Sequence, residues 1–132
     1  MRKALLNLVF LGAAMALAGC AAQPTAEQIA ALNYGPPISQ EWAEAQAKEA
    51  ISSRLKDPYT AQFQFGQVYQ GYVTGSAIEG HKLSPGYLLD VHVNARNSYG
   101  GYTGYKPYKF LFFNGKLVGS WQISKQGLML SF

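Results

Sequence analysis

The sequence predicts an α+β domain in which one N-terminal helix packs on a four- to five-stranded antiparallel sheet. Three observations predict it. Apolar residues recur at three- to four-residue spacing between positions 39 and 56, as on one face of a helix. After Pro58 the apolar period changes to two, which is typical of half-buried strands. Asn114 and Gly115 then separate two alternating runs, and this dipeptide favours the positive φ angles of a tight hairpin.

Residues 1–19 have the composition of an export signal, because Arg2 and Lys3 precede an apolar run of about 15 residues. A helix that spans a bilayer needs roughly 20, so we expect no permanent span. The leader closes on Leu17-Ala18-Gly19-Cys20, which resembles the lipobox of bacterial lipoproteins. The resemblance implies cleavage before Cys20, a diacylglyceryl group on its sulfur and an acylated amino terminus.

Ordinary signal cleavage after Ala16-Leu17-Ala18 is the alternative, and it would leave Cys20 as a free thiol. We favour lipidation, because such a match arises easily in an alanine-rich leader whereas a cysteine at this point does not. In lipoproteins of Gram-negative bacteria, Asp after the lipidated Cys is the usual signal for inner-membrane retention, and here Ala21 follows. The resemblance therefore implies a lipid anchor in the outer membrane. We expect the domain to face the periplasm, although the sequence leaves a surface-exposed orientation open.

Charge and cysteine content limit the partners and the fold. The chain has 11 basic and 7 acidic residues, and removal of Arg2 and Lys3 with the leader lowers the formal charge from +4 to +2. A nucleic-acid partner needs a concentrated basic patch, so we predict none. The 113 residues from Cys20 onward suffice for one domain. Cys20 is the only cysteine, so apolar packing rather than a disulfide must hold the fold.

The expected organisation is a flexible tether over residues 20–38 and a single domain over 39–132. The tether is rich in Ala, Gln and Pro and lacks apolar periodicity. Ser39 can cap a helix that runs to Lys56, and Asp57-Pro58 ends it. Trp42 lies off the apolar stripe, and we expect it to cover the start of the helix. The stripe consists of Ala43, Ala47, Ala50, Ile51 and Leu55.

The strands are expected from alternation and from turn residues. A long bent strand with a bulge at Gly66 runs from about 61 to 73, and 74–86 forms a polar connection. The next strands are Tyr87–Arg96, Tyr105–Phe113 and the run after Gly115. In that run, Leu117, Gly119, Trp121 and Ile123 are expected on one face. A short last strand carries Leu128, Leu130 and Phe132.

One stretch between the second and third strands stands out, because four tyrosines from Tyr99 to Tyr108 fall at a strict spacing of three. The glycines and Pro107 among them exclude a helix. In a binding interpretation, tyrosine and arginine offer contact area with hydrogen bonding. The candidate binding residues are Arg96, Asn97, Tyr99, Tyr102, Tyr105 and Lys106. In a structural interpretation, which the frequency of strand-flanking tyrosines favours, this is only a well-built turn.

The same stretch resembles a motif in small exported bacterial proteins of unknown function. In that motif an Asp-Pro and an aromatic strand precede an Asn-Ala-basic-Asn segment and a Gly-Gly-Tyr loop. Asp57-Pro58, Asn94–Asn97 and Gly100–Tyr102 carry the match, which spans roughly residues 50–118. The resemblance implies no particular activity.

No catalytic or metal-binding pattern follows the leader. His81 and His92 are the only histidines, and a zinc site normally needs three or four ligands, so we predict no metal and no cofactor. The sequence lacks a Gly-x-Ser-x-Gly elbow. A small hydrolase that uses His92 and Asp90 is the least favoured function.

The sequence favours a non-enzymatic binding module for an envelope component, either a glycan or a protein, anchored to the membrane through the lipid on Cys20. The alternative is an accessory subunit of an envelope protein assembly. In that case the exposed edge of the last strand would pair with a partner by strand addition.

Overall fold

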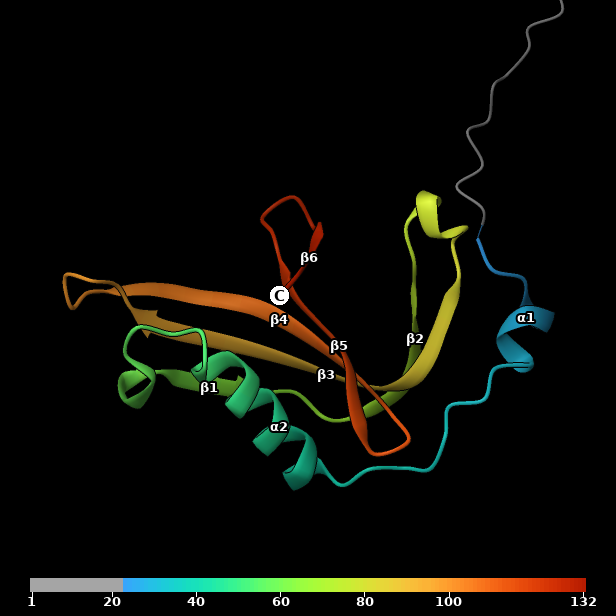
Figure 1. Ribbon diagram of the computed structural model, residues 1–132, viewed down its shortest axis with the longest axis horizontal. Coiled ribbons are helices and arrows are strands. Elements are labelled where there is room, and N and C mark those ends of the chain that lie inside the picture. The colour runs from blue at the N-terminus through green and yellow to red at the C-terminus, as the bar shows by residue number, and fades with distance from the viewer. Residues whose placement is uncertain (1–22) are drawn as a thin grey trace, which may run out of the picture.

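The structure is a computed structural model that describes residues 23–132. The predicted leader, the lipobox and the lipidated Cys20 lie outside the described residues. Within them, the chain forms an α+β arrangement dominated by a six-stranded antiparallel sheet, with a helix against one face (Figure 1). No helix in this part of the chain is both long and apolar enough to cross a membrane.

Residues 23–132 form two α-helices, six strands and two short 3-10 helices. In order they are α1 (Ala26–Ala30), α2 (Gln40–Ser52), η1 (Pro58–Thr60), β1 (Gln62–Phe65), β2 (Tyr69–Thr74), η2 (Ala77–Glu79), β3 (Leu83–Arg96), β4 (Tyr102–Phe113), β5 (Lys116–Ile123) and β6 (Met129–Ser131).

The strand order is β1-β3-β4-β5-β6, and β2 also pairs with β3. β1 pairs with the C-terminal part of β3, and β2 pairs with its N-terminal part. The sheet therefore has six strands rather than four or five, because the long bent strand is divided. The Gln40 side chain explains the break. Its amide donates to Gly66 O at 2.8 Å and accepts from Val68 N at 2.8 Å, so a helix residue replaces the sheet partners of both groups.

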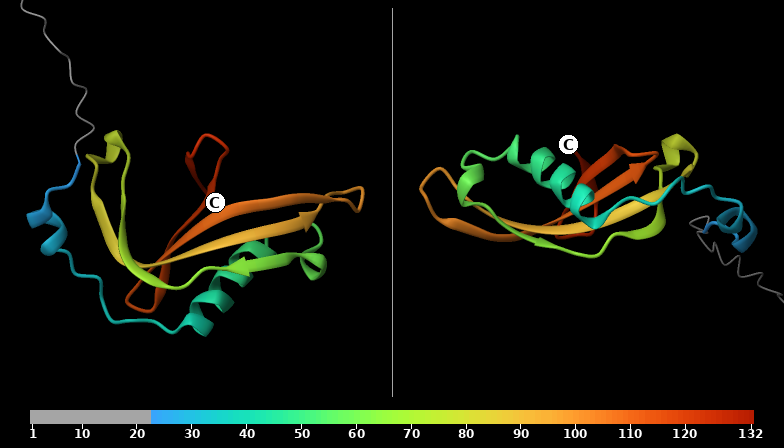
Figure 2. Two further views of the ribbon diagram at one scale, coloured as in Figure 1. Left: turned by 180° about the vertical axis from the view of Figure 1, so that it is seen from behind. Right: turned by 90° about the horizontal axis from the view of Figure 1, so that it is seen from below.

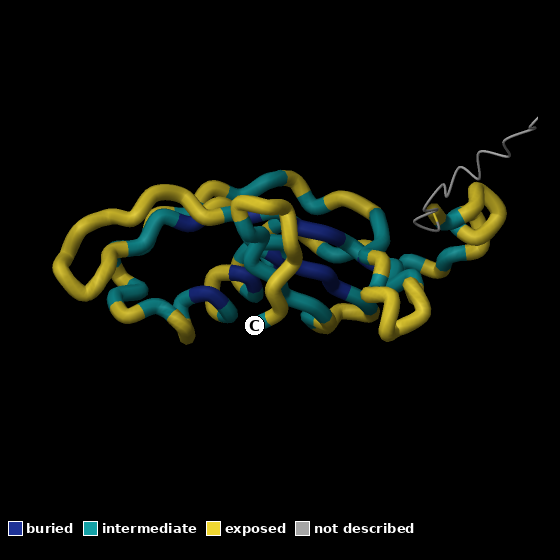
Figure 3. Tube along the Cα trace, turned by 90° about the horizontal axis from the view of Figure 1, so that it is seen from above, coloured by how far each residue is buried: buried dark blue, intermediate teal, exposed yellow. Residues whose placement is uncertain are grey.

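The core lies between α2 and the middle of the sheet, where Figure 3 shows the buried segments. Ala43 and Ala47 are completely buried, and small side chains let the helix approach the strands closely. Trp42 covers the helix start as expected, since its ring meets Phe112 edge-on at 5.4 Å between centroids. The strand residues of this core are Leu89, Val91, Val93, Phe110 and Phe112.

α2 ends at Ser52, before the Lys56 expected from the sequence. The Arg54 and Leu55 amides bond to carbonyls three residues back rather than four. This tighter bonding is common where a helix terminates. The Asp57-Pro58 boundary therefore lies beyond the helix end and instead begins η1.

The β2–β3 hairpin turns sharply away from α2 (Figures 1 and 2). Gly71 and Gly86 face each other at the bend, and a side chain at Gly86 would overlap the carbonyl oxygen of Phe112. β3 begins at Leu83, so Ser84-Pro85-Gly86 is strand and not the predicted polar connection. Residues 83–86 pair only with β2, and such an edge tolerates proline.

β5 also departs from the predicted alternation. The register between β4 and β5 shifts between Leu111 and Phe112, which leaves Val118 as an extra residue. Leu117 packs against the core, whereas Gly119 and Trp121 face the other side of the sheet. The expectation that these residues share one face was wrong, because a bulge exchanges the two faces of a strand.

Candidate functional site

The face of the sheet opposite α2 is called the open face here. Residues paired across neighbouring strands point to the same face of a sheet, so the strand register shows which residues lie on the open face. In the middle of the sheet they are Tyr69, Leu88, Asp90, Lys109, Leu111, Gly119 and Trp121. The bent β2–β3 hairpin and the β5–β6 hairpin both rise on this side (Figures 1 and 2).

The six candidate binding residues lie at the other end of β3 and β4, in a segment we call the tyrosine hairpin (residues 96–106). The expected long loop is only residues 97–101, because β3 extends to Arg96 and β4 begins at Tyr102. The register between β3 and β4 shifts between Asn94 and Arg96, and Gly104 on the facing strand has a φ of 90°, which glycine adopts without strain. Asn94 Oδ1 accepts a hydrogen bond from Gly104 N at 3.0 Å, so the side chain replaces a ladder partner.

Asn97 builds the turn. Its side-chain Oδ1 accepts hydrogen bonds from Tyr99 N at 2.9 Å and Gly101 N at 3.1 Å. The backbone N–H of Asn97 donates to Gly101 O at 2.8 Å. A ligand would have to compete for that oxygen. This geometry favours the structural interpretation for Asn97.

Arg96 and Tyr102 contact each other. The guanidinium carbon of Arg96 lies 5.0 Å from the centroid of the Tyr102 ring, within the range of a cation–π contact. The Tyr102 hydroxyl donates to Thr60 O at 2.9 Å, which ties the hairpin to the segment before β1. Both side chains therefore have structural partners, although Tyr102 is partly exposed.

The remaining candidates do not form one surface. Tyr99 at the tip is 97% exposed, and Tyr105 lies on the open face opposite Asn94. Lys106 pairs with Val93, a core residue, so it lies on the helix side of the sheet. Tyr108 lies on the helix side too, where its ring meets Phe132 edge-on at 5.5 Å and burial raises the pKa of its hydroxyl. The threefold spacing thus divides the tyrosines between two faces.

A polar cluster occupies the centre of the open face. Lys109 Nζ donates to Asp90 Oδ1 at 2.6 Å and to the Tyr69 hydroxyl at 2.8 Å, and Tyr69 donates to Asp90 Oδ2 at 3.1 Å. Burial lowers the pKa of Lys109, but its hydrogen bonds to Asp90 and Tyr69 outweigh this effect and the pKa is raised. Among the hydrogen bonds of residues 23–132, none joins Asp90 to His92, so the carboxylate orients a lysine rather than a histidine.

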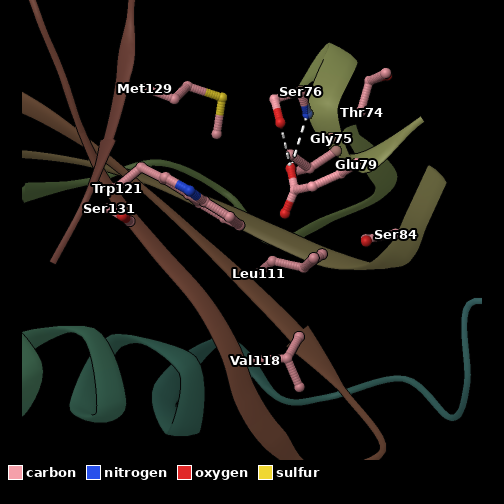
Figure 4. Close-up of a pocket in the computed structure, with 11 residues that line it drawn as sticks. Thr74, Gly75, Ser76, Glu79, Ser84, Leu111, Val118, Trp121, Met129 and Ser131 are labelled. Carbon is pink, nitrogen blue, oxygen red and sulfur yellow. Dashed lines mark hydrogen bonds between the residues drawn. The ribbon is translucent and has the colours of Figure 1, made fainter. Parts of the chain in front are cut away.

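A cavity on the open face was not anticipated from the sequence. We call it the Trp121 pocket. Its volume is about 550 Å³, and Figure 4 shows it between the β2–β3 hairpin and the β5–β6 hairpin. It is lined by Val73, Thr74, Gly75, Ser76, Glu79, Ser84, Leu111, Val118, Trp121, Met129 and Ser131. A glycine two residues before a tryptophan in a strand was the one available signal, since Gly119 leaves room for the indole.

The polar side of the Trp121 pocket is acidic. Glu79 Oε2 accepts hydrogen bonds from Ser76 N at 2.8 Å and Ser76 Oγ at 2.9 Å. The backbone bond, then the side-chain bond, holds the pKa of Glu79 below its ordinary value of 4.5. No lysine, arginine or histidine is among the lining residues. Across residues 23–132, no group of three His, Cys, Asp or Glu residues could hold a metal ion.

No protein-family model matches this chain, and no curated protein or solved structure matches it either. The functional interpretation therefore depends on the geometry described above.

Proposed function

We propose that this chain is a lipid-anchored outer-membrane protein whose domain faces the periplasm and binds an envelope component, a glycan or a protein, without catalysing a reaction. In this proposal residues 1–19 are removed, Cys20 carries the lipid, residues 20–38 form the tether, and 39–132 form one domain with its helix packed on the sheet. The observation that carries the proposal is the open face, which has a cavity and solvent-exposed aromatic rings opposite the helix-covered core.

Exposed aromatic rings support a binding role. Tyr69 and Tyr105 are both partly exposed on the open face, and Tyr99 extends beyond it. Tyrosine is enriched where proteins bind partners, because it offers a large rigid contact area and a hydroxyl. The candidates Arg96, Tyr102 and Lys106 add positive charge and a further ring at the hairpin end.

The polar groups of the open face support binding rather than catalysis. Asp90 and Lys109 neutralise each other at its centre, and Tyr69 completes their hydrogen bonds. A general base must be free to accept a proton from a substrate, and the Asp90 carboxylate is already engaged on both oxygens. A hydrolase built on His92 and Asp90 would first have to break this cluster.

The test is a cross-linked pull-down of the lipidated full chain from whole envelopes, read for protein by mass spectrometry and for glycan by sugar analysis. We expect one component to be recovered reproducibly and to be depleted by a Tyr99→Ala/Tyr105→Ala double variant. Lys116→Ala is the control, because this exposed residue lies at the opposite end of the sheet. Recovery of nothing above background would contradict the proposal.

A second candidate function, the accessory subunit of an envelope assembly, is favoured by the β6 edge. β6 pairs only with β5, and Leu128 and Leu130 are 61% and 53% exposed. An exposed apolar edge strand can accept a strand from another chain. A stoichiometric complex that Leu130→Pro abolishes, and that the Tyr99→Ala/Tyr105→Ala variant leaves intact, would favour this function over the first.

A further inference from the structure

We propose that the Trp121 pocket binds one ring of a neutral glycan, with the Trp121 indole as the stacking platform and the side chains across the cavity as hydrogen-bond partners. The inference rests on the proposed binding function and names the ligand class. It places the contact at a site distinct from the tyrosine hairpin.

The indole is held flat by the sequence around it. A side chain at Gly119 would lie 2.7 Å from Trp121 Cζ2, so only glycine lets the ring lie along β5. Figure 4 shows the ring beside the cavity, with Met129 on one side and Leu111 on the other. One face of the ring therefore rests on the strand, and the cavity lies on the other side.

A sugar ring matches such a platform. One side of a pyranose presents C–H groups, which are attracted to the negative face of an aromatic ring and are removed from water on contact. Leu111, Met129 and Val118 extend the apolar surface around the indole. The volume of about 550 Å³ falls within the range of small-molecule sites.

The rest of the lining matches sugar hydroxyl groups. Glu79 is fixed by two hydrogen bonds to Ser76 through Oε2, and among the described hydrogen bonds none reaches Oε1. Its lowered pKa keeps it ionised, so that oxygen only accepts hydrogen bonds. Ser84 and Ser131 contribute hydroxyls that both donate and accept. A ligand rich in hydroxyl groups satisfies both kinds of partner.

The charge of the lining residues distinguishes a neutral glycan from anionic and cationic ligands. The lining residues carry one carboxylate and no basic group, so an anionic polymer would be repelled. A cationic amine could pair with Glu79, but an ammonium group has no acceptor for the protons of the Ser84 and Ser131 hydroxyls. A neutral glycan is therefore favoured over a charged ligand of either sign.

The full chain purified in detergent provides a direct test, because it contains only two tryptophans. Trp42 packs on Phe112 in the core, so Trp42→Phe leaves Trp121 as the single indole reporter. The probes are a soluble N-acetylglucosamine oligomer, a maltose-type oligomer, heparin as a polyanion and choline as a cation. Fluorescence and calorimetric titrations give the affinity for each.

We expect saturable binding of at least one neutral oligomer, a fluorescence change in Trp42→Phe, and about tenfold weaker binding in Trp121→Ala, equivalent to about 1.4 kcal/mol. Gly119→Ala should weaken binding as well, and thermal melts of each variant will show that it folds. Binding restricted to heparin or choline, or neutral-oligomer affinity unchanged in Trp121→Ala, would overturn the inference. So would the absence of binding by both neutral oligomers.

The envelope pull-down distinguishes failure of the glycan inference from failure of the proposed binding function. If the envelope pull-down still recovers a component with the Trp121→Ala variant, the chain is a binding module whose site is elsewhere. If wild-type protein recovers nothing from envelopes, the broader proposal fails too.

Discussion

The tyrosine hairpin and the Trp121 pocket use similar residue types in opposite ways. In the hairpin, Asn97 bonds to backbone amides of its own turn, and the Tyr102 hydroxyl bonds to Thr60. In the pocket, a tryptophan, a carboxylate and several hydroxyls surround a cavity of about 550 Å³. Polar groups with hydrogen-bond partners in the chain stabilise it. Glu79 Oε1 and the Ser84 and Ser131 hydroxyls line the cavity and have no partner among the hydrogen bonds of residues 23–132, so they remain available to a ligand.

Two tyrosine substitutions should differ most in their effect on the free energy of unfolding. Tyr108→Ala should lower the free energy of unfolding by about 3 kcal/mol, because it removes a ring packed on Phe132 and the core. Tyr99→Ala should change it by less than about 0.5 kcal/mol, because that ring contacts solvent. Urea denaturation measures both. Equal effects would contradict the packing of Tyr108 on the core and the solvent exposure of Tyr99.

Two glycines test which region depends on close packing. Gly119→Ala should cost about 2 kcal/mol and shift tryptophan fluorescence, because the new methyl group displaces the indole. Gly101→Ala in the hairpin is the matched control, since its added methyl group would meet nothing closer than 3.7 Å. An unshifted emission spectrum in Gly119→Ala would contradict the placement of the indole.

The hairpin turn should depend on a single oxygen. Asn97→Ala should cost about 1 kcal/mol, because the Tyr99 and Gly101 amides lose their shared acceptor. Asn97→Asp keeps an acceptor and should recover most of the loss. Thermal unfolding compares them, and an Asp variant as unstable as the Ala variant would show that the oxygen is not what matters.

The smallest expected effect concerns pH and the rim of the pocket. The folded-state pKa of Glu79 lies below 4.5, so its stabilising effect is present above that pH and is lost as pH falls through the lowered pKa. Wild type should therefore melt slightly higher than Glu79→Gln near neutral pH, and the two should converge in acid. A difference that stays constant with pH would exclude this carboxylate as the cause.

The sequence predicted the sheet better than the site. Alternation located most of the strands, and Asn114-Gly115 forms the expected turn between β4 and β5, with φ values of 48° and 67°. Local patterns sufficed there, because each strand buries one face and each turn has its own residue requirements.

The site depends on structural features that local sequence patterns do not indicate. The Gln40 side chain divides one strand in two, and Val118 as an extra residue exchanges the faces of β5. The Gly71–Gly86 pair bends the β2–β3 hairpin over the open face. The Gln40 bonds and the glycine pair join residues far apart in the sequence, and the register shift lies within one hairpin. Together they form a pocket from side chains that no spacing rule would group.

The most direct test of the central claim, that the open face binds an envelope component, is photo-cross-linking in intact envelopes from a reactive residue at position 118. Val118 is 55% exposed at the rim of the Trp121 pocket, and Glu49 on α2 offers an exposed control position on the side of the sheet that the helix covers. We predict a discrete cross-linked product from position 118 and none from position 49. Equal yields from the two positions, or no product from position 118, would contradict the claim.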